Sequence, residues 1–144
     1  SDIYRNYEFL AQKKDISLKL EMEDDLPLVF ADISLVERAI QNLMDNAIKF
    51  TPEQGVVTVN IVSKAMNVEI NIKDSGPGIK EESHALIFER YRQTKSGKKN
   101  EGAGLGLAIV RKIVELHNSH IRVISKPNEG ATFSFTLPIH QLST

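Results

Sequence analysis

The sequence lacks cysteine, carries almost no net charge and contains no long apolar run. The absence of cysteine excludes thiol catalysis, disulfides and cysteine-ligated zinc or iron–sulfur sites. A net charge of −1 argues against a nucleic-acid partner, because nucleic-acid binders usually carry a concentrated basic face. No run approaches the roughly 20 apolar residues of a membrane helix, and no signal peptide opens the chain. We therefore expect no membrane contact by this chain.

What is present is typical of a single globular domain. The chain has 144 residues, of which 41% are hydrophobic and 26% are charged. A chain of this length can bury a stable hydrophobic core without disulfides or structural metal ions. The first residue is Ser1 and not an initiator Met, so we expect the chain to be a piece of a longer protein. We expect this piece to be monomeric by itself.

The periodicity of apolar residues predicts an α+β fold. Alternation of apolar and polar residues predicts strands over 16–22, 29–31, 56–62, 68–73, 121–124 and 132–137. Helical spacing predicts helices over 3–12, 81–91 and 105–116, and a long helix that Asp32 or Ser34 caps and Pro52 ends. Together they predict a two-layer sandwich, with a mixed, mostly antiparallel sheet and the helices on one face.

The long helix carries polar side chains beside its apolar face. At 100° per residue, Asn42, Asn46 and Lys49 lie within about 60° of each other. Buried polar groups cost free energy unless something satisfies them. Either the two amides satisfy neighbouring backbone, or they and Lys49 hold a metal ion and a polyphosphate. For the two amides alone the first interpretation is favoured.

Two glycine-rich segments follow. Asp74-Ser-Gly-Pro-Gly78 comes directly after a strand, where the carboxylate could accept a hydrogen bond from the amino group of adenine; the alternative is an Asx-type turn. Gly102-Ala-Gly-Leu-Gly106 opens a helix, where backbone N–H groups can bind phosphate; the alternative is a flexible hinge. Neither the dinucleotide fingerprint nor a P-loop fits these spacings. His117 and His120 have no third metal ligand spaced with them, so we expect them to be satisfied or exposed.

The order of these motifs resembles the ATP-binding catalytic domain of sensor histidine kinases, in the GHKL superfamily. Asn42 to Phe50 is similar to the N box, and Asp74 to Gly78 to the G1 box. Phe88 to Tyr91 is similar to the F box, and Gly102 to Gly106 to the G2 box. The resemblance implies a GHKL fold, with residues 16–140 as the catalytic domain, 92–104 as the ATP lid, and 1–15 as a helical lead-in from a missing dimerisation hairpin.

The resemblance also implies the site. Asn46 would bind the Mg²⁺ that bridges the ATP phosphates, while Asn42 and Lys49 would contact phosphate; these three are the expected catalytic residues. Thr132 would support Asp74 and the base from the last strand. The other expected nucleotide contacts are Asp74, Gly76, Gly78, Ile79, Tyr91, Gly102, Gly104, Leu105, Gly106 and Leu107. One departure is His117-Asn-Ser119, where the family often has His-Gly-Gly; Asn tolerates the left-handed conformation.

The expected activity is that of a protein histidine kinase. Superfamily hydrolases carry a general-base Glu where this chain has Asn42, which favours transfer to a protein acceptor. The acceptor would be a histidine on the dimerisation hairpin, followed by the aspartate of a response regulator. The resemblance further implies a homodimeric full-length protein and a cytoplasmic domain of a bacterial membrane-bound sensor. A serine-directed anti-sigma kinase and a nucleotide-sensing module without turnover are the alternatives.

Overall fold

The computed structural model describes residues 2–84, 86–89 and 103–139. The elements along the chain are α1 (Asp2–Lys13), β1 (Ser17–Met22), α2 (Ile33–Phe50), β2 (Val56–Lys64), β3 (Asn67–Asp74), the 3₁₀ turns η1 (Glu81–Ser83) and η2 (Leu86–Phe88), α3 (Ala103–Leu116), β4 (Arg122–Ser125) and β5 (Ala131–Pro138).

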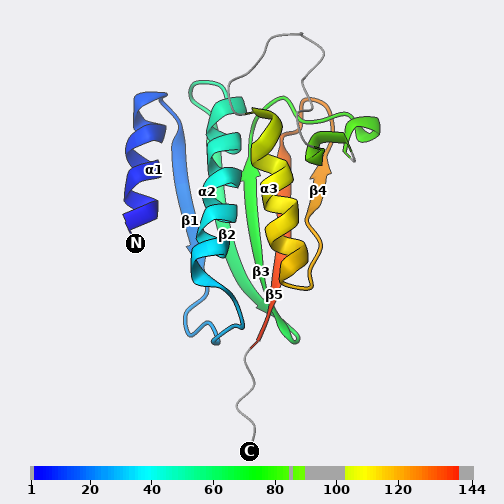
Figure 1. Ribbon diagram of the computed structural model, residues 1–144. Coiled ribbons are helices and arrows are strands. Elements are labelled where there is room, and N and C mark those ends of the chain that lie inside the picture. The colour runs from blue at the N-terminus through cyan, green and yellow to red at the C-terminus, as the bar shows by residue number, and fades with distance from the viewer. Residues whose placement is uncertain (1, 85, 90–102, 140–144) are drawn as a thin grey trace, which may run out of the picture.

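The strands form one five-stranded sheet in the order β1-β2-β3-β5-β4. β1 pairs with β2 in parallel, and the other three pairings are antiparallel. Figure 1 shows α1, α2 and α3 side by side on one face of this sheet. The predicted two-layer α+β sandwich with a mixed, mostly antiparallel sheet is therefore confirmed. None of the described helices combines the length and hydropathy needed to cross a bilayer.

The core lies between the two layers. Its largest fully buried side chains include Leu43 and Val110 from the helices and Ile72, Phe133 and Phe135 from the sheet. Burial of such a side chain stabilises the fold by about 1.5–3 kcal/mol relative to exposure. The packed interface therefore fixes how α2 and α3 sit on β3 and β5, which matters because these elements carry the predicted site.

The helix α2 begins and ends where the sequence predicts. Asp32 is the N-cap, and its Oδ1 accepts a hydrogen bond from the main-chain N–H of Leu35 at 3.1 Å. Thr51 follows the helix in extended conformation, and the residue after it is Pro52, which cannot continue a helix. Of the two N-caps considered, the structure uses Asp32.

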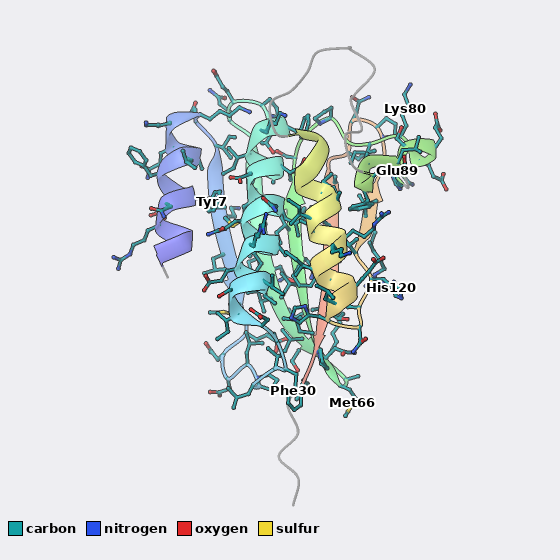
Figure 2. All side chains as sticks on the ribbon, viewed as in Figure 1. Tyr7, Phe30, Met66, Lys80, Glu89 and His120 are labelled. Atoms are coloured by element: carbon teal, nitrogen blue, oxygen red, sulfur yellow. The ribbon has the colours of Figure 1, made fainter. Side chains whose placement is uncertain are left out.

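The helix α1 contributes to the same core. Tyr7 and Ala11 are buried with the core residues of α2, and the Tyr7 hydroxyl donates a hydrogen bond to the Gln41 carbonyl at 3.0 Å. Figure 2 shows the Tyr7 side chain between the two helices. Burial and the neighbouring Asp45 carboxylate raise the pKa of Tyr7. The segment that we expected as a lead-in to the domain thus packs against α2.

Two predicted elements differ from the structure. The strand predicted over 29–31 is a single bridge between Val29 and Ile139, because the chain turns at once into the Asp32 cap. The helix predicted over 81–91 is two short 3₁₀ turns, in which His84 N–H bonds to Glu81 O and Glu89 N–H to Leu86 O. Tyr91 lies outside the described residues. The long helix α3 begins at Ala103, two residues earlier than predicted.

The turn after α3 is as predicted. Asn118 adopts φ 58°, the left-handed conformation that Asn tolerates. The His117 ring is satisfied, since Nε2 accepts a hydrogen bond from the Asp32 N–H at 3.0 Å and Nδ1 lies 2.8 Å from Ile113 O. Within the described ranges, no group of three His, Asp or Glu side chains is placed to hold a metal ion. His117 therefore joins the end of α3 to the start of α2.

Candidate nucleotide-binding site

Three predicted motifs meet at one end of the sandwich. The last turns of α2, the turn after β3 and the first turn of α3 all lie at the upper end in Figure 1. α2 and α3 pack against each other along their length. The fold therefore brings Asn46, Lys49, Asp74 and Gly106 to the same end of the molecule, although up to 60 residues of chain separate them.

Asp74 is a buried carboxylate at the end of β3. Its side chain is 5% exposed, and its Oδ1 accepts a hydrogen bond from the Gly76 N–H at 2.8 Å. Burial raises the pKa of Asp74, against the opposite effect of the Gly76 and Ala131 N–H groups. The Asx-type turn considered as an alternative is therefore present. It uses Oδ1 and is compatible with a second, ligand-binding role for the carboxylate.

The turn from Asp74 to Ile79 is bonded to the loop between β4 and β5. The Asn128 N–H donates to Pro77 O at 2.5 Å. The Ile79 N–H donates to Ser125 Oγ at 2.7 Å, and this hydroxyl donates to Gly130 O at 2.6 Å. No sequence motif pointed to Ser125 or to residues 127–130 as part of the site. These residues fix the position of the turn that follows Asp74.

Glycines make this close contact possible. Gly78 has φ +79° and Gly130 has φ +74°, a conformation that L side chains rarely adopt. A Cβ on Gly78 would overlap the carbonyl of Lys126, and one on Gly130 would overlap the carbonyl of Asp74. A Cβ on Gly76 would lie 2.8 Å from Phe50 O at the end of α2. Backbone packing thus requires all three glycines before any ligand is considered.

The polar residues of α2 differ in their surroundings. The Asn42 Nδ2 is fully buried, with no hydrogen-bond partner among the residues that the structure describes. Leaving such a group unsatisfied costs about 1–3 kcal/mol. Asn46 is partly buried, and Lys49 is exposed with its ammonium 5.3 Å from the centre of the Phe50 ring. The unsatisfied Asn42 amide favours the interpretation in which a ligand supplies an acceptor.

The remaining predicted contacts are distributed as follows. Ile79 and Leu107 are partly buried against the core. Gly104 and Leu105 belong to the first turn of α3, and a Cβ on Gly106 would meet no described atom within 4 Å. Phe88 is a buried core residue, in edge-to-face contact with Phe133 at 6.0 Å between ring centres. Gly102, Tyr91 and residues 92–102 of the predicted lid lie outside the described residues.

The predicted support of Asp74 by Thr132 is wrong. The register pairs Asp74 with Ala131 and Lys73 with Thr132. Residues directly opposite each other in an antiparallel pair share a face, and successive residues alternate between faces. The Thr132 side chain therefore lies on the opposite face of the sheet from Asp74. The alternation of Ala131, Phe133, Phe135 and Leu137, all buried, is the sequence signal that could have indicated the covered face.

A substitution of Gly106 tests whether a ligand approaches the backbone at the start of α3. Gly106→Ala is expected to stabilise the ligand-free protein by about 0.5–1 kcal/mol, because Ala is the better helix former and its Cβ meets no described atom within 4 Å. The same Cβ should obstruct a phosphate that approaches the helix backbone, so ATP affinity should fall at least about fivefold. Urea unfolding and calorimetric titration measure the two effects. An unchanged affinity would show that no ligand group approaches this position.

The fold and the candidate site are those expected of a nucleotide-binding α+β domain, and sequence comparison names its family. The family model for "Histidine kinase-, DNA gyrase B-, and HSP90-like ATPase" matches residues 31–141. The chain therefore belongs to this family of ATP-binding domains.

The individual relatives are sensor histidine kinases. The chain is 42% identical over 139 residues to the adaptive-response sensory kinase SasA of Rippkaea orientalis, covering 96% of this chain but 36% of that protein. The nucleotide-free catalytic domain of histidine kinase ThkA superposes with a TM-score of 0.84 at 32% identity, covering 96% of this chain and 88% of that one. Full-length ShkA in complex with AMPPNP gives 0.82 at 29% identity, with coverages of 99% and 30%. The domain is thus the ATP-binding catalytic domain of the sensor histidine kinase type.

Proposed function

We propose that this domain binds Mg-ATP and transfers the γ-phosphoryl group to a histidine on an adjacent dimerisation domain, for relay to the aspartate of a response regulator. The observation that carries the proposal is that the buried Asp74 follows β3 at the end of the sandwich where the last turns of α2 lie, while α2 also carries the unpartnered Asn42 amide. Asp74 would read the adenine amino group, and the α2 side chains would hold the phosphates.

The residues present fit a magnesium ion that is held mainly by its nucleotide. Mg²⁺ keeps several waters and takes few protein ligands, so the Asn46 amide oxygen together with phosphate oxygens suffices. In the described part of the chain no cluster of acidic side chains offers a dedicated metal cage. The ion would supply charge neutralisation, while Asn42 donates to a phosphate oxygen and Lys49 adds its positive charge. Phosphoryl transfer depends mainly on such positioning and neutralisation.

Transfer to a protein is favoured over hydrolysis by the chemistry of Asn42. Related hydrolases would carry a general-base Glu at this position, whereas an amide cannot take a proton from water. The Nδ2 group of Asn42 is instead a buried donor without a described partner, which suits an anion. The domain would therefore bind ATP without hydrolysing it until an acceptor histidine reaches the γ-phosphate.

The partners follow from the same proposal. The chain spans 36% of the length of the SasA kinase named above, so other domains act in proteins of this kind. We propose that residues 1–15 connect a dimerisation hairpin to a catalytic domain over 16–140, with the predicted lid over 92–104. The full-length protein would be a homodimer with a response regulator as its partner. A membrane-bound parent protein remains a prediction of the sequence.

Asn46 tests the metal assignment. Asn46→Ala is expected to remove most of the Mg²⁺ dependence of ATP binding, because the one protein ligand of the ion is lost. We expect about a tenfold weaker affinity with Mg²⁺ and little change with EDTA. Asn6→Ala, at an exposed position of α1, is the control. An Asn46→Ala protein with the wild-type ratio of affinities would contradict the assignment.

Adding an acceptor tests transfer. A purified dimerisation hairpin from a histidine kinase is mixed with this domain and ATP labelled at the γ-phosphate. Acid-labile, alkali-stable label on the hairpin is the expected result, because phosphohistidine has that stability pattern. Binding of ATP without label on any supplied hairpin would favour the nucleotide-sensing module. Alkali-labile, acid-stable label on a serine substrate would favour the serine-directed kinase.

A further inference from the structure

The end of α1 is attached to the end of α2 by one side chain. The ammonium of Lys14 donates hydrogen bonds to the carbonyl oxygens of Ile48, at 2.7 Å, and Lys49, at 2.8 Å. The last carbonyls of a helix have no partner within the helix and carry its negative dipole end. A partly buried cation at this point both satisfies two carbonyls and fixes the direction of the last turn.

Lys14 is itself held in place. Asp15 adopts φ 62°, the Asp15 N–H bonds to Gln12 O at 3.1 Å, and the Ile16 N–H bonds to Ala11 O at 2.8 Å. This pair of bonds is the Schellman motif, which ends a helix with a defined geometry. Ala11 and Ile16 are both buried in the core. The ammonium of Lys14 therefore reaches α2 from a fixed backbone.

Main-chain bonds strengthen the same attachment. The Gln54 N–H donates to Asp15 O at 2.6 Å, and the Ser17 N–H donates to Gly55 O at 3.0 Å. The turn after α1 is thus bonded to the loop after α2, and Thr51 between them is fully buried. The last turn of α2 is therefore attached to the end of α1 by main-chain bonds as well as by the Lys14 side chain.

The last residue of α2 contacts the turn that follows Asp74. Phe50 O would lie 2.8 Å from a Cβ on Gly76, and the Gly76 N–H is bonded to the Asp74 carboxylate. Contacts therefore run continuously from Lys14, through the last turn of α2, to Asp74. Lys49, which we assign to phosphate, lies in the middle of this series.

We propose that Lys14 is a positioning residue for the nucleotide site. Its ammonium holds the last turn of α2 so that Lys49 and the Gly76 turn stand in the arrangement that ATP requires, without touching the nucleotide. The inference rests on the proposed function, because it assigns the site to Lys49 and Asp74. Under this proposal, a displacement at the N-terminal side of the domain reaches the nucleotide site through α1.

Lys13 provides a matched control. It precedes Lys14, carries the same charge, and places its ammonium 4.7 Å from the centre of the Phe9 ring at an exposed position. We expect Lys14→Met to weaken Mg-ATP binding about fivefold or more, and Lys13→Met to change it less than about twofold. Because both variants lose one positive charge, a difference between them reports the hydrogen bonds. Lys14→Arg, which can donate to both carbonyls, should restore most of the affinity.

A second measurement separates positioning from general loss of stability. In the ligand-free protein, the amide resonances of Lys49 and Gly76 are expected to shift in Lys14→Met and to stay unchanged in Lys13→Met and in Ile113→Val. The last variant loses a methyl group in the core at a site remote from Lys14 and destabilises the fold by about 0.5–1.5 kcal/mol. Shifted resonances without loss of ATP affinity, or equal affinities of Lys14→Met and Lys13→Met, would overturn the proposal.

The same data distinguish the two proposals. A wild-type domain that fails to bind Mg-ATP contradicts the proposed function, and the resonances of Lys49 and Gly76 still report whether Lys14 fixes their position. A wild-type domain that binds, with unshifted resonances in Lys14→Met, contradicts only the role of Lys14. Failure of Lys14→Arg to restore the affinity would likewise count against the hydrogen bonds to the α2 carbonyls.

Discussion

Asp74→Asn is expected to weaken Mg-ATP binding by about 10- to 100-fold while leaving the ligand-free fold intact. Asn has the shape of Asp, and its Oδ1 can still accept the Gly76 N–H that Asp74 accepts at 2.8 Å. The second atom then becomes an amide donor, which in the proposed site would face the amino group of adenine, also a donor. Loss of a hydrogen bond to a charged group corresponds to about 1.5–3 kcal/mol.

The same substitution is expected to raise stability at neutral pH. Burial raises the pKa of Asp74 in the folded state above its ordinary value, so folding favours the neutral carboxyl. The stability that this group contributes is present below its unfolded pKa of about 3.9 and is lost as the pH rises through the folded pKa. At pH 7 the ionised carboxylate therefore opposes folding, whereas Asn carries no such charge.

Two measurements check these expectations for Asp74→Asn. Calorimetry with ATP and GTP measures binding, and the preference for ATP should narrow in the variant, because the Asn amide can donate to the carbonyl of guanine. Urea unfolding between pH 4 and 8 measures stability, and the wild type should lose stability relative to Asp74→Asn as the pH rises. Asp24→Asn, at an exposed position, is the control. Unchanged ATP affinity would remove Asp74 from the base site, and a variant less stable at pH 7 would contradict the argument from burial.

The features that the sequence predicted correctly depend on neighbours along the chain. Helical spacing and the Asp32 cap identified α2, and alternation identified the long strands, because both signals are local. The predictions of a strand over Val29–Ala31 and of a helix over 81–91 were wrong for the opposite reason. A few residues cannot form either element by themselves, and tertiary contacts such as the Val29–Ile139 bridge decide their conformation.

The candidate site shows the same division. The residue types of the site could be recognised as motifs in the sequence, whereas the register decides that Thr132 lies opposite Lys73 and not opposite Asp74. A shift of one residue moves a side chain to the other face. The contacts of Lys14 with Ile48 and Lys49 join residues about 34 positions apart, and no local pattern marks them. Motifs thus indicated the chemistry, and the packing determined which residues support it.

The glycines of the Asp74 turn give the largest expected change in stability. Gly78→Ala should destabilise the ligand-free protein by roughly 3 kcal/mol or more. An L residue in the left-handed region costs about 1–2 kcal/mol, and here the Cβ also overlaps the Lys126 carbonyl. Relief of that overlap would break the bonds from Asn128 to Pro77 and from Ile79 to Ser125. A domain of this kind has only about 5–15 kcal/mol of stability.

Gly106→Ala is the matched control, since it adds the same methyl group with the opposite expected sign. If glycine were needed at Gly78 only to admit a nucleotide, Gly78→Ala would retain its stability and lose only ATP affinity, as we expect of Gly106→Ala. Urea unfolding of both ligand-free variants decides this. A large loss of stability that is confined to Gly78→Ala would mean that this glycine is required for the contact between the Asp74 turn and the loop after β4. The proposed base site would then depend on that contact.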